Sequence, residues 1–240
     1  MSERKNNKVE ESEKFYNNSF LNFDYQLAEY NFQTIKPYFK GKLCLELGPA
    51  NGFMTKHLVN EFNELHLLEG SEFLLSQIPD YQNVVKHLSF FEDFETNIKF
   101  DTIIMSHVLE HIADPVFILK KIKRWLAPDG ILLVSVPNAK SIHRLVAVQM
   151  GLLSSIYELN SRDHELGHYR LYDMETLRLH VIDAGFNIIE SGGVFFKPLS
   201  NGQIEKFWST DMIEGFYKVG SLFPENCAEI FVVAKLNDLL

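Results

Sequence analysis

The sequence predicts an α/β fold built on a doubly wound, mainly parallel sheet, with helices on both faces and helical cap insertions. Three observations predict it. Short β-like runs alternate with segments of helical spacing through the first part of the chain. The first run ends in a glycine-containing loop that leads into a helix, and the last run follows a long excursion. Strand-helix alternation of this kind is typical of parallel sheets whose crossover helices cover both faces.

The strands are predicted from short apolar runs, of which the first reads LCLEL and the last EIFVVAKL. Gly192 and Gly193 interrupt the sixth run and indicate a bulge or bend there. Because the last run comes late and after an excursion, we expect it to join the sheet as an antiparallel edge strand. The seven predicted strands are 43–47, 65–69, 83–88, 100–106, 130–137, 186–196 and 229–236.

The helices are predicted from apolar residues at helical spacing. SIHRLVAVQMGLL, at 141–153, reads as an inserted helix, whereas YELNSRDHELGHYRLYD, at 157–173, reads as a loop. Gly185 closes the helix that precedes the sixth strand. The predicted helices are 53–62, 71–78, 114–126, 141–153, 174–184 and 204–223.

The chain divides into a tail, a lid and one main domain. Residues 1–14 are polar and charged, and we expect them to be disordered. Residues 15–41 are aromatic-rich and helical in spacing; with Tyr16 and Tyr25 they either close over a bound cofactor as a lid or pack against the sheet edge. Residues 42–240 form the main domain, with cap segments near 141–172 and 200–224.

Composition excludes several functions. The chain has 240 residues, 46% of them hydrophobic, and a formal net charge of −9, which disfavours a nucleic-acid partner. No run approaches the roughly 18 apolar residues of a membrane helix, and the polar start lacks the apolar stretch of a secretion signal. We therefore expect a cytoplasmic protein with no membrane partner. Cys44 and Cys227 make no disulfide framework.

The most informative segment is the loop after the first strand. Glu46 ends the strand, Gly48 to Gly52 form the loop, and a helix starts near Phe53. Small residues let the backbone approach a ligand, and the helix start presents free N–H groups. Glu69, which ends the second strand, can hold both hydroxyls of a ribose. These features predict a nucleoside-type ligand over the carboxyl ends of the strands.

The loop fits a dinucleotide fingerprint poorly, because Ala50 stands where the second glycine would be. Glu-x-Gly-x-Ala-x-Gly instead resembles the first motif of class I S-adenosylmethionine-dependent methyltransferases. Further stretches resemble the ubiquinone-methyltransferase-like branch of that family, in order and at the right intervals. They are FDTIIMS at 100–106 with HVLEHIADP at 107–115, WLAPDGILL at 125–133, VPN at 136–138 and AGF at 184–186.

The resemblance implies a seven-stranded Rossmann-like methyltransferase domain that takes S-adenosylmethionine as its cofactor. It implies methyl transfer to an oxygen or nitrogen of a small polar acceptor, with a nucleotide- or lipid-linked sugar ahead of amino or phenolic metabolites. A methyltransferase fold without transfer activity is the alternative, and a homodimer stays open. The cofactor-binding residues it implies are Glu46, Gly48, Pro49, Ala50, Gly52, Phe53, Glu69, Gly70, Ser71, Phe90, Phe91, Glu92, Ser106 and His107.

Two stretches match zinc-hydrolase motifs. His107 to His111 reads His-x-x-Glu-His, and His164 to His168 reads His-Glu-x-x-His. A zinc hydrolase needs the two histidines of the second motif on one face of a helix. Gly167 and the polar residues upstream favour a loop, so we predict no metal. The resemblance leaves open a divalent ion at Asp163, His164 or His168 that orients the acceptor.

Residues on the acceptor side are predicted from chemistry and from the resemblance together. A hydroxyl acceptor needs a base, which a histidine supplies near neutral pH. Arg170 either pairs with an anionic group of the acceptor or covers a helix end. The acceptor-side candidates are His111, Asn138, His164, His168 and Arg170.

Overall fold

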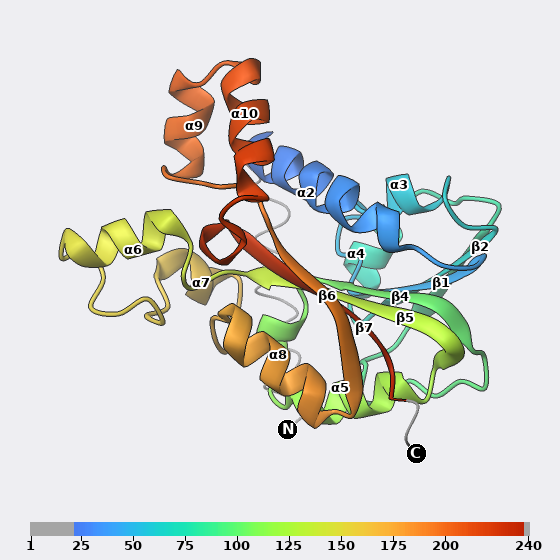
Figure 1. The fold of residues 1–240 in the computed structure, drawn as a ribbon. Helices are drawn as coiled ribbons and strands as arrows, with labels where there is room; N and C mark the ends of the chain where they lie inside the picture. Colours follow the sequence, from blue (N-terminus) through green and yellow to red (C-terminus); the bar gives the residue numbers. More distant parts are fainter. Residues whose placement is uncertain (1–21, 238–240) are drawn as a thin grey trace.

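A seven-stranded sheet in the order β3-β2-β1-β4-β5-β7-β6 runs through the molecule (Figure 1). The computed structural model describes residues 22–237. Neighbouring strands from β3 to β5 pair in parallel, and β7 runs antiparallel to both β5 and β6. The predicted α/β class and mainly parallel sheet are confirmed. The strands are β1 (Leu43–Leu47), β2 (Glu64–Glu69), β3 (Val84–Leu88), β4 (Phe100–Ser106), β5 (Leu126–Pro137), β6 (Phe186–Val194) and β7 (Glu229–Leu236).

Helices cover both faces of this sheet, while α6, α9 and α10 extend beyond it (Figure 1). The α-helices are α2 (Asn22–Ile35), α3 (Thr55–Leu58), α4 (Glu72–Gln77), α5 (Pro115–Lys123), α6 (Ile142–Gln149), α7 (Ser161–Glu165), α8 (Met174–Asp183), α9 (Asn201–Phe207) and α10 (Thr210–Gly220). The 3-10 helices are η1 (Lys36–Tyr38), η2 (Leu109–His111) and η3 (Pro224–Asn226).

The core has two halves, one on each face of the sheet. Because side chains alternate along a strand, Leu45 and Leu47 of β1 face one half and Cys44 faces the other. Helices α5 and α8 pack on the first half, and α2, α3 and α4 on the second (Figure 1). Both faces of the central strands are buried, which explains why their sequences read as apolar runs rather than as an alternating pattern.

The prediction that the last strand lies at the sheet edge is wrong. β7 inserts between β5 and β6, and β6 is the edge strand. The burial of the two strands accounts for this, because six consecutive residues of β7 are buried whereas β6 is largely exposed. The last strand is antiparallel, as predicted, but its apolar run suits an interior position.

Several predicted elements change in detail. The predicted helix 204–223 is two helices, because Trp208 leaves the helical conformation and Ser209 caps α10 by accepting a hydrogen bond from Met212 N. The predicted loop 157–173 contains the short helix α7. In β6 the irregular register falls between Ile188 and Glu190, before the glycine pair. Gly193 instead lets the β6 backbone lie close to the carbonyl of Pro224, since a Cβ at this position would be 2.2 Å from Pro224 O.

The N-terminal helix lies where the sequence predicts one. Phe23 of α2 packs edge-on against Phe195, with ring centroids 5.1 Å apart, so α2 is joined to the segment after β6. The predicted tail 1–14 and Tyr16 lie outside the described residues. Among residues 22–237, every helix is too short or too polar to cross a membrane.

Candidate active site

The ends of four strands meet at one edge of the sheet and build the site. β1, β4 and β5 run parallel and finish at this edge. β7 runs the opposite way and starts there, so Glu229 pairs in register with Pro137 at the end of β5. Ligands of open α/β sheets bind outside the carboxyl ends of the strands. The topology therefore places an acid from the last strand beside the glycine loop.

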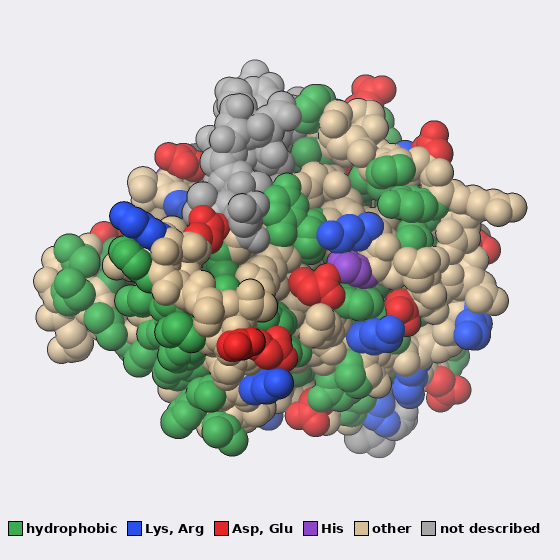
Figure 2. Space-filling model, turned by 90° about the horizontal axis from the view of Figure 1, so that it is seen from above, with side chains coloured by type: hydrophobic (Ala, Val, Ile, Leu, Met, Phe, Trp, Pro, Cys, Tyr) green, Lys and Arg blue, Asp and Glu red, His purple; other side chains and the backbone are tan. Residues whose placement is uncertain are grey.

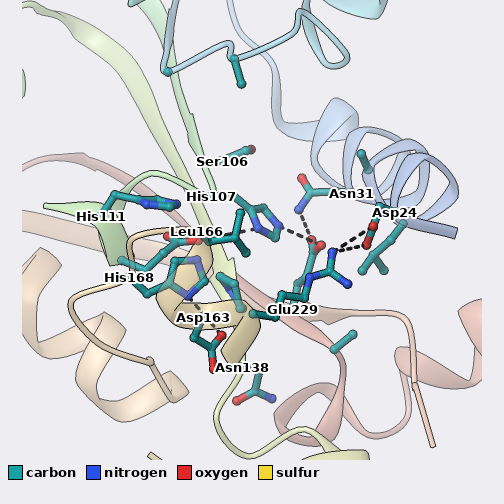
Figure 3. Close-up of a pocket in the computed structure, with 18 of the residues that line it drawn as sticks. Asp24, Asn31, Ser106, His107, His111, Asn138, Asp163, Leu166, His168 and Glu229 are labelled. Atoms are coloured by element: carbon teal, nitrogen blue, oxygen red, sulfur yellow. Dashed lines mark hydrogen bonds and ion pairs between the residues drawn. The ribbon is translucent and has the colours of Figure 1, made fainter. Parts of the chain in front are cut away.

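A cavity of about 280 Å³ opens at this edge. Figure 3 shows polar side chains from α2, β4, β7 and the α7 region converging on it. Its walls carry both charges, because carboxylates, histidines and a lysine share them. The sequence-predicted residues among its lining are Glu46, Gly48, Pro49, Ala50, Phe53, Ser106, His107, His111, Asn138 and His168.

The glycine loop adopts the backbone that its residues allow. Gly48 and Gly52 have φ of +62° and +77°, in the left-handed region that glycine occupies at no steric cost. A Cβ at Gly48 would lie 2.7 Å from Val108 Cγ2, so a side chain does not fit there. Ala50, the departure from the family motif, also has a positive φ of 49°. The strained loop therefore keeps its backbone open to the cavity.

Two buried glutamates brace this loop. Glu46 accepts a hydrogen bond of 2.7 Å from Thr55 Oγ1 of α3. Burial raises the pKa of Glu46 to about 8, with the nearby charge of Glu69 adding to the effect. Glu69 accepts hydrogen bonds from Ser71 N at 2.9 Å and Ala50 N at 3.3 Å. Both acids lie where the sequence predicts them, at the ends of β1 and β2.

The residues predicted for the adenosine half lie apart from the cavity wall. The ring of Phe90 covers Gly70, since a Cβ on Gly70 would lie 3.0 Å from Phe90 Cδ1. Phe91 packs against the buried core. Gly52 faces Ile78, with 2.9 Å between a Cβ there and Ile78 Cγ1. The predicted cofactor residues absent from the cavity lining are Gly52, Glu69, Gly70, Ser71, Phe90, Phe91 and Glu92.

His107 is held in an ion pair that the sequence did not suggest. Its backbone has a φ of 54°, directly after β4 ends, and its Nε2 lies 2.8 Å from Glu229 Oε1. Burial disfavours the imidazolium, but the Glu229 carboxylate outweighs it and raises the pKa of His107 to about 9. Asn31 of α2 donates to the other oxygen, Oε2, at 2.5 Å. His107 is thus a cation near neutral pH.

A second charged cluster ties three helices together at the mouth of the cavity. Asp24 of α2 accepts two hydrogen bonds of 2.9 Å from Arg162 of α7. Asn201 of α9 donates to the same carboxylate at 2.6 Å. Lys197 donates to Asn201 Oδ1 at 2.8 Å, and its burial lowers the pKa of the ammonium to about 8. Helices α2, α7 and α9 are therefore joined around one acid.

The two histidine motifs do not form two helical metal sites. β4 ends before His107, and the rest of the first motif is the 3-10 helix η2. In the second motif α7 ends at Glu165, and Gly167 turns the chain with a φ of +77°. His164 is exposed and lies outside the cavity lining, while His168 is buried within it. His164 and His168 therefore do not share a helix face.

Two acceptor-side candidates have structural partners. The Arg170 guanidinium donates to the backbone carbonyls of Ile112 and Ala113, the second at 2.9 Å, so it covers the end of η2. Asn138 lines the cavity, but its Nδ2 donates to Glu225 O and Cys227 O, each at 2.8 Å. The structure thus favours the covering role for Arg170 that the sequence left open.

Sequence reasoning missed Glu229, Asn31, Asp24 and Lys197, all of which line the cavity. One signal was available for Glu229. An acid opens the otherwise apolar strand EIFVVAKL, and an antiparallel last strand begins where the parallel strands end. The other three sit in segments that show no motif. Their position depends on how α2 and α9 fold over the site.

Comparisons with known proteins agree with this geometry. A family model described as "Methyltransferase domain" matches residues 23–191. Pavine N-methyltransferase from Thalictrum flavum subsp. glaucum is 29% identical over 102 residues, covering 39% of this chain and 29% of that protein. Ubiquinone biosynthesis O-methyltransferase from Actinobacillus pleuropneumoniae serotype 7 (strain AP76) is 31% identical over 111 residues, covering 46% and 44%. The match thus spans less than half the length of either relative.

The fold is shared more widely. The structure of a S-adenosylmethionine-dependent methyltransferase from Thermotoga maritima, described as a possible histamine N-methyltransferase, superposes with a TM-score of 0.65 at 15% identity. The superposition covers 96% of this chain and 100% of that one. The fold is that of class I S-adenosylmethionine-dependent methyltransferases. The chain belongs to the methyltransferase-domain family, whose cofactor is S-adenosylmethionine.

The residues fit that cofactor. Its sulfonium and amino groups are positive, and Glu46, Glu110 and Asp24 place carboxylates on the cavity wall. The loop at Gly48 has no room for a side chain and so leaves its backbone as the contact surface. Walls that carry both charges beside an open backbone suit S-adenosylmethionine, which has positive groups and a carboxylate.

Proposed function

We propose that the protein transfers a methyl group from S-adenosylmethionine to an oxygen or nitrogen atom of a small polar acceptor. The observation that carries this is the glycine loop, which opens directly into a cavity that is also lined by histidines, among them the buried His168. S-adenosylmethionine supplies an activated methyl group on a sulfonium. The protein contributes position and charge, which is most of the catalysis in an in-line displacement.

On the cofactor side, we assign the methionine half to the loop from Glu46 to Ala50 together with Ser106 and His107. Glu69 is assigned to the ribose hydroxyls. Its oxygens accept backbone hydrogen bonds from Ala50 and Ser71, which fix the carboxylate at the end of β2, beside the glycine loop. Gly70, Ser71 and the Phe90–Glu92 segment are assigned to the adenine.

On the acceptor side, we assign His111 and His168 as the groups that can hold a proton. Their rings meet edge-to-face with centroids 4.7 Å apart, and both line the cavity (Figure 3). His168 Nδ1 lies 3.2 Å from Asp163 Oδ1, which orients the ring. A carboxylate beside a histidine favours the imidazolium that forms when the ring takes a proton from a hydroxyl.

The surroundings of the cavity favour an acceptor with a polar and an apolar part, such as a lipid-linked sugar. His143 and Arg144, in the first turn of α6, line the cavity. The same helix leads outward to exposed apolar side chains, among them Val146, Met150 and Leu152. Hydrophobic side chains gather at that end of the molecule in Figure 2. Such a patch suits an alkyl chain attached to the reacting group.

We also propose that α2 and the segments 141–172 and 200–224 act as a lid and cap over the site. The Asp24 cluster joins α2, α7 and α9, as described above. Release of those bonds would open the mouth of the cavity without disturbing the sheet.

The proposal is tested by incubating the protein with S-adenosylmethionine labelled in its methyl group and with pools of glycolipids, nucleotide sugars, phenols and amines. Mass spectrometry then identifies any acceptor that gains a labelled methyl group. Transfer to at least one pool supports the proposal. Tight cofactor binding without transfer to any pool, and without slow cofactor hydrolysis, would favour a cofactor-binding protein that does not transfer.

A further inference from the structure

Residues from both zinc-like motifs meet at a common point in the cavity wall. Glu110 and His111 come from η2, and His168 comes from the turn after α7. Each offers a ligand atom, and these three atoms lie within 4.8 Å of one another. Neither sequence motif is intact as a metal site, yet the fold assembles a carboxylate and two imidazoles from both of them.

Hydrogen bonds to main-chain atoms hold η2 and the turn after α7 together. Tyr169 N donates to Glu110 O at 2.9 Å, directly beside His168. Arg170 adds its bonds to the carbonyls of Ile112 and Ala113, on the other side of His111. Gly167, with its positive φ, turns the chain from α7 into this contact. The two segments are therefore held together by main-chain contacts rather than by the three side chains themselves.

Glu110 provides the second observation. Its side chain is fully buried and lines the cavity, yet neither carboxylate oxygen accepts a hydrogen bond from any part of the described chain. His107 Nδ1 lies 3.7 Å from Oε1, which is near enough for an ion pair but beyond hydrogen-bond distance, so His107 compensates the charge without donating to the carboxylate. A buried carboxylate without a hydrogen-bond donor is costly unless a cation or a ligand satisfies it.

We propose that Glu110, His111 and His168 bind a divalent transition-metal ion, such as Zn²⁺ or Mn²⁺, in the wall of the cavity. Two imidazole nitrogens and one carboxylate oxygen suit such ions better than Mg²⁺ or Ca²⁺, which prefer oxygen ligands. Asp163 does not contact the ion but lies beside Nδ1 of His168. It favours the tautomer of His168 whose Nε2 carries a lone pair.

The geometry needs modest adjustment to hold an ion. Two ligands of a tetrahedral zinc ion lie about 3.3 Å apart, so the widest separation would close by roughly 1.5 Å. Rotation of the imidazole rings supplies such a movement without moving the backbone. Three protein ligands leave further coordination positions, and since all three residues line the cavity these positions face the acceptor. When the ion is bound, His111 and His168 are its ligands and do not accept a proton, and the ion would polarise the acceptor hydroxyl in their place. This use of the ion rests on the proposed function, whereas binding does not.

The test is a titration of the full-length chain, without an affinity tag, after removal of metals by a chelator. Zn²⁺ binding is measured by calorimetry, and Co²⁺ binding by its visible absorption, with neither cofactor nor acceptor present. We expect one ion per chain and a rise in melting temperature on adding Zn²⁺. Mg²⁺ is expected to give neither signal. Failure of methyl transfer would leave these readouts unchanged, so the two proposals can fail separately.

Matched variants decide which residues bind. Glu110→Gln, His111→Ala and His168→Ala are each expected to weaken Zn²⁺ binding at least about tenfold. His164→Ala, from the same sequence motif as His168 but exposed, is expected to bind as the wild type does. Circular dichroism and the metal-free melting temperature check that each variant folds. The proposal is overturned if the wild type binds no ion at micromolar concentrations, or if His164→Ala loses binding while Glu110→Gln keeps it.

Discussion

The Nε2 atom of His107 lies 2.8 Å from Oε1 of Glu229 and so joins the end of β4 to the start of β7. The two residues are far apart in sequence, and the antiparallel insertion of β7 brings them together. The pair places a positive imidazolium next to the glycine loop, compensated by a buried carboxylate. It also connects the sheet to α2 through Asn31.

Glu229→Gln should lower the pKa of His107 from about 9 toward its ordinary value of 6.5, because burial would then be opposed only by the weaker charges of Glu110 and Asp24. The replacement keeps the size of the side chain and its place beside Asn31. The imidazole is followed by NMR over pH 5 to 10, about the range that covers both states. An unchanged titration of His107 would show that Glu229 does not hold its proton.

Glu69→Ala should weaken binding of S-adenosylmethionine by about 1–3 kcal/mol, because charge-assisted hydrogen bonds to the ribose are lost. Titration calorimetry measures the change. Glu72→Ala is the control, since Glu72 lies three residues away on the exposed face of α4. Equal affinities in the two variants would remove Glu69 from the cofactor site.

His168→Ala should reduce turnover by about 100-fold or more while leaving cofactor affinity near that of the wild type, because proton transfer and acceptor positioning are lost. The comparison needs the acceptor found in the labelling experiment. His164→Ala, at an exposed position, should keep full turnover. A His168→Ala enzyme with normal turnover would exclude His168 from the reaction.

Asp173→Asn should destabilise the fold by about 1 kcal/mol near neutral pH, because the ion pair between the buried Asp173 and the partly exposed Lys140 is lost. Asp173 caps α8 and lies 2.8 Å from Lys140 Nζ. Although burial opposes ionisation, Lys140 and the Thr176 bonds hold the pKa of Asp173 well below its ordinary 3.8. Asparagine still caps a helix, so the variant removes mainly the charge.

The sign of the pH dependence follows from that depressed pKa. The carboxylate stabilises the folded state above pH 3.8, the unfolded value, and this contribution is lost as the pH falls below it. Denaturant unfolding of the wild type and of Asp173→Asn should therefore give a difference in free energy of unfolding that is constant near neutral pH. This difference should shrink below about pH 4. A difference in free energy of unfolding that grows on acidification would contradict the depressed pKa of Asp173.

The sequence predicted best those features that depend on local pattern. Strands 43–47, 100–106 and 229–236 have the predicted bounds, because each is an apolar run between clear turn residues. The loop at Gly48 was recognisable because its glycines are required by the local backbone conformation. The order of β7 and β6 in the sheet could not be predicted, because no local sequence feature indicates which strand pairs with β5.

The candidate site was predicted in the same uneven way. Residues at strand ends, such as Glu46 and His107, were found from the motif. Glu229, Asp24 and Lys197 were missed because their roles come from contacts between elements distant in sequence. The cluster of Glu110, His111 and His168 was missed because each motif was weighed alone, while the fold combines them.

A crystal structure of the protein grown with S-adenosylhomocysteine tests the central claim most directly. The account predicts that the amino-acid end of the ligand lies against the backbone from Glu46 to Ala50 and that its ribose hydroxyls meet the Glu69 carboxylate. A structure with the ligand bound elsewhere, or with a nicotinamide dinucleotide competing for this loop, would contradict it.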